Sequence, residues 1–250
     1  MSSSTLIFGL HAVESALKRD PAGIEQLWCD AQRKDKRLRE LVALAENQGV
    51  HPQWVQKSEL DKLLPGQARH QGVAARVSGV AEHNENFLEQ LLVGLNEPPL
   101  LLVLDGVTDP HNLGACLRSA DAAGVHPVIA PRDRACGLTP VVRKVASGAA
   151  ESLPFIQVTN IARTLKSLRD AGVWVIGTAL EEAATSLFQT SLTGPLALVL
   201  GAEGKGLRRL TRENCDELIY IPMAGTVQSL NVSVATGICL FEALRQRSKE

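Results

Sequence analysis

The chain has 250 residues, of which 45% are hydrophobic and 21% are charged, and its formal net charge is −1. This length allows one large domain or two ordinary ones, and the near-neutral charge means that affinity for nucleic acid must come from local patches. Five scattered cysteines without a CxxC pair disfavour a zinc site or a disulfide framework and suit a reducing compartment. We find neither a signal peptide nor a run of about 20 apolar residues, and therefore expect a cytoplasmic protein.

The first part of the chain, residues 1–77, is expected to form a small α/β domain. Short strand-like runs alternate with segments of helical spacing. A unit of this size lies within the range that folds independently. The expected helices are Gly9–Lys18, Lys34–Gln48 and Ser58–Leu64, and the expected strands are Ile24–Cys29, His51–Val55 and Gly72–Val77.

A change of composition over residues 78–99 indicates a linker. This segment holds four Glu residues, no Lys or Arg, and the pair Pro98-Pro99. Its one helical pattern covers Asn86–Leu95. We therefore expect the linker to join the first domain to a second one over residues 100–250.

From Leu100 onward, continuous apolar runs alternate with helical segments. Such runs are typical of strands that crossover helices bury on both faces. The alternation predicts an α/β domain with a mostly parallel sheet between helices. The expected strands are Leu100–Leu104, Pro127–Ala130, Leu153–Val158, Val173–Gly177, Leu196–Leu200 and Leu218–Ile221, and the expected helices are Leu113–Ala123, Thr139–Ala149, Ile161–Ala171, Leu207–Asn214 and Asn231–Gln246.

Three polar, glycine-containing segments follow the carboxyl ends of predicted strands, where open α/β sheets bind ligands. They are Leu104–Arg118, Leu198–Leu207 and Ile221–Gly237. Neither a GxGxxG dinucleotide fingerprint nor a phosphate-binding P-loop is present. Each segment also has an explanation without chemistry, in which polar residues cap helices and glycines form turns with positive φ. The caps would be Asp109, Asn112 and Ser229, and the turn residues Gly201, Gly204 and Gly206.

Taken together, the segments resemble the three motifs of the SpoU/TrmH family of SPOUT RNA methyltransferases. The motifs are N-x5-R from Asn112 to Arg118, L-G-x-E-G-x-G from Leu200 to Gly206, and I-P-M-x-G-x-x-x-S-L-N-V-S-x-A from Ile221 to Ala235. The N-terminal region, with Gly-Leu-His-Ala-Val starting at Gly9, is similar to the ribosomal-protein-like RNA-binding domain of the branch that acts on 23S rRNA. The resemblance covers nearly the whole chain.

This resemblance implies a fold, a cofactor and a reaction. The C-terminal parallel-sheet domain would contain a trefoil knot, which is an exception to the rule of unknotted chains. S-adenosyl-L-methionine would donate a methyl group to the 2′-oxygen of a guanosine ribose in 23S rRNA. Family members act as homodimers through the knotted domain, and the apolar last helix would supply either part of that contact or part of the monomer core.

The resemblance also assigns residues to the site. Arg118 is the family's residue for activating the nucleophile, but a free guanidinium, with a pKa above about 12, is a poor base. We therefore expect Arg118 to hold the 2′-oxygen and its neighbouring phosphate in line and to stabilise negative charge. The catalytic set is Arg118, Asn112, Glu203, Ser229 and Asn231, and the cofactor is expected against the backbone of Thr178, Leu200, Gly201, Ile221, Pro222 and Leu230.

Besides Asn112, which could cap a helix, three of these catalytic residues have structural alternatives. Arg118 could pair with Asp121, three residues further along a helix surface. Ser229 could cap the last helix, and Glu203 could be an exposed loop acid.

A basic run in the N-terminal domain is a candidate for RNA binding. Five cations occur within seven residues, which suits salt-dependent contact with phosphates. They are Arg33, Lys34, Lys36, Arg37 and Arg39. The alternative is a solvated helix face. A second basic group comprises Arg132, Arg134, Arg143 and Lys144, and the low aromatic content of 4% does not favour a base-stacking platform.

Other functions remain open at this point. The same fold serves tRNA and antibiotic-resistance rRNA 2′-O-methyltransferases, although the compact N-terminal domain favours the ribosomal branch. A non-catalytic RNA-binding or ribosome-assembly protein would be expected to have damaged motifs, whereas every motif position is intact. The missing glycine fingerprint disfavours a Rossmann-type methyltransferase.

Overall fold

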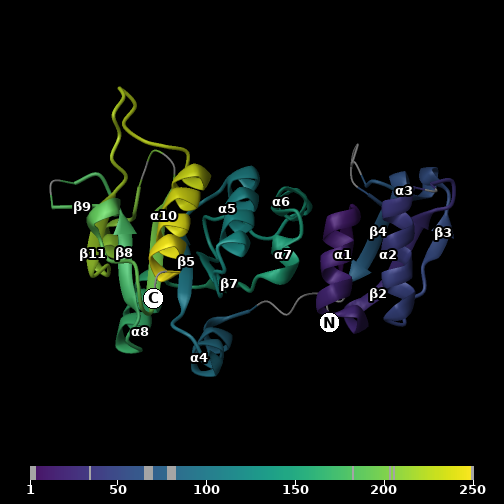
Figure 1. Ribbon diagram of the computed structural model, residues 1–250, viewed down its shortest axis with the longest axis horizontal. Helices are drawn as coiled ribbons and strands as arrows, with labels where there is room; N and C mark the ends of the chain where they lie inside the picture. Colours follow the sequence, from purple (N-terminus) through teal and green to yellow (C-terminus); the bar gives the residue numbers. More distant parts are fainter. Residues whose placement is uncertain are drawn as a thin grey trace. The chain divides into compact units, whose positions relative to one another are not determined.

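The computed structural model describes residues 4–33, 35–64, 70–77, 83–181, 183–202, 204 and 206–248 (Figure 1). The chain divides into two compact units, one of Met1–Ala81 with Leu138–Ser152 and one of Glu82–Gly137 with Leu153–Glu250. No helix among the described residues is both long and apolar enough to cross a membrane.

The first unit contains a four-stranded sheet in the order β1-β4-β2-β3. β4 is antiparallel to both β1 and β2, whereas β3 is parallel to β2. Three strands match predicted ones, and β1 is absent from the prediction because four residues are too short to show a period. The strands are β1 Thr5–Phe8, β2 Ile24–Asp30, β3 Gln53–Val55 and β4 Val73–Val77.

Helices cover both faces of this sheet. α1 (Leu10–Arg19) and α2 (Lys36–Asn47) pack against one face, and α3 (Lys57–Leu63) packs against Trp28 on the other. Asp35 caps α2 by accepting a hydrogen bond from the Leu38 N–H at 3.3 Å. This cap makes α2 begin two residues after the predicted start.

The helix predicted over Thr139–Ala149 is in fact two helices, α6 (Pro140–Ala146) and α7 (Ala149–Ser152). Ser147 and Gly148 separate them with positive φ values of 54° and 102°. A Cβ on Gly148 would lie 2.4 Å from the Ser15 hydroxyl of α1, so both this contact and the positive φ favour glycine here.

The second unit is built on a seven-stranded, wholly parallel sheet in the order β7-β6-β5-β10-β8-β11-β9. This confirms the predicted α/β class, and the short β9 is the one strand that the prediction lacks. The strands are β5 Leu100–Asp105, β6 Val128–Pro131, β7 Phe155–Val158, β8 Trp174–Thr178, β9 Thr185–Ser186, β10 Leu196–Gly201 and β11 Glu217–Tyr220.

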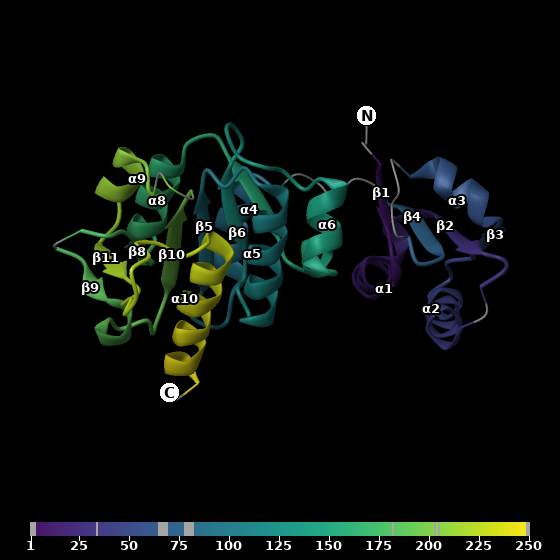
Figure 2. The same cartoon turned by 90° about the horizontal axis from the view of Figure 1, so that it is seen from above.

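Helices bury this sheet on both faces, as the continuous apolar runs predict (Figure 2). α5 (Pro110–Ala122) and α10 (Val232–Arg247) lie side by side on one face. α4 (Glu85–Gly94) and α8 (Ile161–Asp170) pack on the other, and α9 (Arg209–Glu213) packs beside α8. α4 lies in the segment expected to be a linker, and it inserts Leu88 into the core.

Candidate active site

The carboxyl ends of β8, β10 and β11 surround a cavity of about 420 Å³. Its lining comes from three segments that are distant in sequence, because parallel strands deliver their following loops to one edge of the sheet. The lining residues are Thr178, Ala179, Leu180, Leu200, Gly201, Ala202, Gly204, Gly206, Ile219, Tyr220, Ile221, Met223, Gln228, Ser229, Leu230, Val232 and Ala235.

Five of the six residues expected to hold the cofactor line this cavity, and Pro222 does not. The sequence interpretation missed Tyr220, Gln228 and Val232, although each lies within three residues of an expected position. Ala224 and Gly225, two small residues of the third motif, are exposed and also lie outside the lining.

The loop after β10 is shaped by its backbone. A Cβ on Gly201 would lie 2.1 Å from the carbonyl carbon of Gly206, so no side chain fits there. The Gly206 N–H donates to the Ala202 carbonyl at 2.9 Å and closes the loop. Gly204 and Gly206 have φ values of 73° and 62°, as the turn interpretation expects, whereas Gly201 is required for close approach.

Two asparagines join the first and third motifs. The Asn231 Oδ1 accepts hydrogen bonds from the Ser233 N–H at 2.9 Å and from the Ser233 hydroxyl at 2.6 Å, which caps α10. Its Nδ2 then donates to the Asn112 Oδ1 at 2.9 Å. Asn231 therefore holds the start of α10 against the first turn of α5.

The cap of α10 is Asn231 and not Ser229, so the structural alternative for Ser229 is wrong. Ser229 is exposed and lines the cavity. Glu203, the remaining predicted loop residue, lies outside the described residues.

Arg118 lies on the exposed side of α5 and is not among the residues that line the cavity. It lies six positions after Asn112, and at roughly 100° per residue the two side chains point about 120° apart around the helix axis. The structure thus does not place Arg118 against the cavity of its own chain.

The cavity suits an adenosine-containing cofactor held by backbone groups. Its volume lies within the range of small-molecule sites, and most of its lining is apolar or glycine. The Thr178 hydroxyl, one of its polar groups, donates to the Val199 carbonyl at 3.4 Å. Among the described residues, no cluster of three or more His, Cys, Asp or Glu could hold a metal ion.

One contact that sequence analysis missed anchors the far end of the β10 loop. Asp105, at the end of β5, is fully buried, and its Oδ2 accepts a hydrogen bond from the Arg208 N–H at 2.9 Å. Its Oδ1 lies 3.5 Å from the Arg208 Nε. These two residues are 103 positions apart, so no local pattern marks them.

The basic run that we expect to bind RNA, residues 33–39, lies at the start of α2. Arg33 pairs with Asp35 and holds the pKa of that carboxyl below its usual value. The Lys36 Nζ lies 3.7 Å from the Glu40 carboxylate on the exposed surface of the helix, and Arg37 and Arg39 are also exposed. Lys34 lies outside the described residues.

The second predicted basic group is wrong at one position. Arg143 is buried, and its Nη1 donates to the Glu151 carboxylate at 2.9 Å. It fixes the corner between α6 and α7 and is not a surface cation.

Comparison with known proteins finds a matching family for each of the two parts of the chain. The SpoU rRNA Methylase family matches residues 99–241, and the family described as RNA 2′-O ribose methyltransferase substrate binding matches residues 6–82. The 23S rRNA (guanosine-2′-O-)-methyltransferase RlmB of Escherichia coli K12 is 57% identical over 245 residues, 98% of this chain and 100% of that protein. RlmB of Ralstonia nicotianae is 55% identical over 248 residues, 99% of this chain and 98% of that protein.

Solved structures of methyltransferases are similar in fold to this chain. The SpoU methyltransferase AviRb from Streptomyces viridochromogenes, in complex with AdoMet, is similar with a TM-score of 0.79 and 28% identity, over 99% of this chain and 92% of that one. The AdoMet-bound rRNA methyltransferase from Sinorhizobium meliloti has a TM-score of 0.78 and 26% identity, over 97% and 87% of the two chains. On its motifs, its parallel-sheet fold and these relatives, the chain belongs to the SpoU rRNA methylase family.

Proposed function

We propose that this protein transfers a methyl group from S-adenosyl-L-methionine to the 2′-oxygen of a guanosine ribose in 23S rRNA. The observation that carries the proposal is the cavity formed by the second and third motifs, to which Asn231 ties the first motif. Relatives with this activity in their names are 55–57% identical over nearly the full chain. The intact motifs argue against a non-catalytic protein of the same fold.

The cofactor supplies an electrophilic methyl group bonded to a positively charged sulfur. Thr178, Leu200, Gly201, Ile221 and Leu230 are the residues that would hold it, largely through backbone N–H and C=O groups. The apolar walls keep water away and strengthen these polar contacts.

Arg118 prepares the ribose for attack. Its guanidinium holds the 2′-oxygen and the neighbouring phosphate in line with the methyl group and stabilises the negative charge that develops on oxygen. The 2′-proton would leave to the phosphate or to water, because a guanidinium that is already protonated has no free lone pair to accept it.

A homodimer would bring Arg118 to a cavity that it does not line in its own chain. α10 presents an outward stripe of Val234, Ile238 and Phe241, at the i, i+4 and i+7 spacing of one helix face. Val234 and Phe241 are each 50% exposed. We place the subunit contact on this stripe, so that Arg118 of one subunit serves the cofactor of the other, and we place the trefoil knot in the segments around the cavity.

The N-terminal unit would hold the rRNA. The cations Arg37 and Arg39 lie exposed in the first turn of α2, where the helix dipole also favours an anion. With 23S rRNA or an assembling large ribosomal subunit as partner, the protein would act in the cytoplasm.

The direct test is transfer of radiolabelled methyl from S-adenosyl-L-methionine to unmodified 23S rRNA and to bulk tRNA. Arg118→Ala is compared with the control Lys166→Ala, which removes an exposed cation from α8. We expect label in 23S rRNA as 2′-O-methylguanosine, lost with Arg118→Ala and kept with the control. Label in tRNA alone would overturn the substrate, and RNA binding without label would overturn the catalytic proposal.

A further inference from the structure

A second cavity, of about 530 Å³, opens at the same edge of the sheet as the cofactor cavity. It lies beyond the carboxyl ends of β6 and β7, beside α9. Arg134, Arg208 and Arg209 contribute three guanidinium groups to its lining, and Asp133 contributes the one carboxylate. On a chain with a net charge of −1, this is a local excess of positive charge.

The three arginines differ in how firmly they are held. Arg134 is exposed, has a φ of 57°, and forms no ion pair with any described residue. Arg209 pairs with Glu213 at 2.8 Å, but its side chain is 70% exposed, and such surface pairs exchange readily for a better partner. Arg208 is anchored on Asp105. The cavity thus offers two cations that a ligand can engage and one that fixes its wall.

The location of this cavity connects it with methyl transfer. In the sheet order, only β5 separates β6 from β10, so the nearest strands that border the two cavities lie two strand spacings, or roughly 10 Å, apart along the edge. Arg208 begins the wall of the second cavity two residues after Gly206, which lines the first. A nucleotide adjacent to one whose ribose is at the cofactor cavity can reach this distance.

We propose that the arginine-lined cavity binds a backbone phosphate of an RNA nucleotide next to the one that is methylated. This inference rests on the proposed RNA substrate. Guanidinium groups bind phosphate oxygens in bidentate geometry. None of the described residues that line the cavity is aromatic, so the cavity would bind the backbone and leave base recognition to other surfaces.

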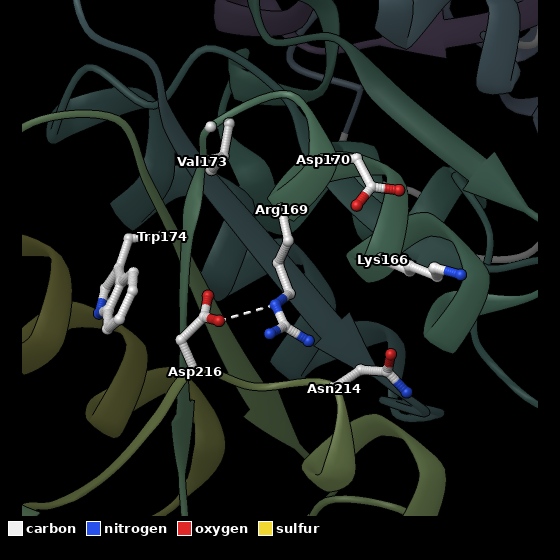
Figure 3. A pocket seen from close by; sticks show the side chains of 8 residues that line it. Lys166, Arg169, Asp170, Val173, Trp174, Asn214 and Asp216 are labelled. Atoms are coloured by element: carbon white, nitrogen blue, oxygen red, sulfur yellow. Dashed lines mark ion pairs between the residues drawn. The ribbon is translucent and has the colours of Figure 1, made fainter.

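A cavity at the opposite edge of the sheet supplies a matched comparison (Figure 3). It also holds two cations, Lys166 and Arg169, but two carboxylates balance them. The Arg169 Nε lies 2.7 Å from the Asp216 carboxylate, and Figure 3 shows the two side chains turned toward each other. This neutral cavity lacks the charge excess that a phosphate needs.

The experiment measures binding of a 23S rRNA fragment by fluorescence anisotropy at several salt concentrations, together with methyl-transfer kinetics. The test variant is Arg134→Gln with Arg209→Gln, and the control is Lys166→Gln. We expect the test variant to weaken RNA binding roughly tenfold and to reduce the slope of log Kd against log salt by about 1. Its kcat at saturating RNA and its affinity for S-adenosyl-L-methionine should stay unchanged, as should all properties of the control.

An unchanged Kd and salt slope in the test variant would overturn the proposal. So would an equal loss in the control, because the effect would then be general electrostatics. If the test variant unfolds at a lower temperature, Arg134→Lys with Arg209→Lys keeps the charges and should restore the salt slope. Parent protein that binds the RNA with this arginine-dependent slope but does not methylate it would refute the proposed function and leave the phosphate site standing.

Discussion

The Asn231 side chain makes two interactions at the start of α10, and two different substitutions can distinguish between them. Its Oδ1 caps the helix through Ser233, and its Nδ2 holds Asn112 at 2.9 Å. Asn231→Ala removes both interactions. Asn231→Ser keeps a capping oxygen of similar quality but is too short to reach Asn112.

The magnitudes follow from these contacts. Loss of an N-cap costs about 1 kcal/mol, and loss of a partly buried hydrogen bond costs about 1 kcal/mol more. Asn231→Ala should therefore lower the free energy of unfolding by about 2 kcal/mol, or roughly 4–8 °C in Tm for a chain of this size. Asn231→Ser should lose about half of that. Methyl transfer should fall equally in both variants, because both release Asn112.

The assay is thermal unfolding followed with and without S-adenosyl-L-methionine, since a ligand raises the Tm of the unit that binds it and so identifies the transition to compare. Initial rates of methyl transfer are measured on the same preparations. Equal Tm values for Asn231→Ala and Asn231→Ser would refute the capping argument. Parent-like activity in both variants would refute the role given to the link with Asn112.

Three further predictions concern other parts of the chain. Gly201→Ala should weaken cofactor binding at least tenfold by calorimetry, because its Cβ would collide with Gly206, whereas Gly204→Ala, at an open position, should have a smaller effect. Burial raises the pKa of the Cys239 thiol to about 12, so this one thiol should lower the free energy of unfolding by up to about 1.4 kcal/mol per pH unit as pH rises from about 8.5 toward 12. Cys239→Ala should remove this contribution and make the fall less steep in urea titrations at graded pH. Glu151→Leu should cost about 3–5 kcal/mol by leaving the guanidinium of Arg143 buried without its partner. The double variant with Arg143→Met should recover most of that loss in the same denaturation assay, and a double variant as unstable as the single one would contradict this account.

Sequence patterns predict the regular elements of this protein well, because burial on both sides leaves a continuous apolar signal. The strand predicted over Leu100–Leu104 is extended in the structure by Asp105 alone. The break at Ser147 escapes prediction, since serine has no strong preference for the left-handed conformation that it adopts here.

The sequence predicts the parts of the site whose residues are close together in the chain. It does not reveal contacts between residues that are far apart in the chain. The loop from Gly201 to Gly206 carries its glycines in sequence, and the structure shows why each is needed. The pairing of Asp105 with Arg208 depends on two strands meeting at one sheet edge, which no spacing reveals. Pro222 is a residue of the third motif but does not line the cavity, because a motif fixes the course of a loop and not the direction of each side chain.

The two faces of α10 would couple cofactor binding to self-association. Val232 and Ala235 form part of the cavity wall, while Val234 and Phe241 face outward from the same helix. If the outward stripe joins two subunits, a ligand that shifts α10 changes the strength of self-association, and self-association changes the ligand's affinity by the same factor. The apparent Kd for S-adenosyl-L-methionine would then depend on protein concentration, and a dilution series of binding titrations would report the coupling directly.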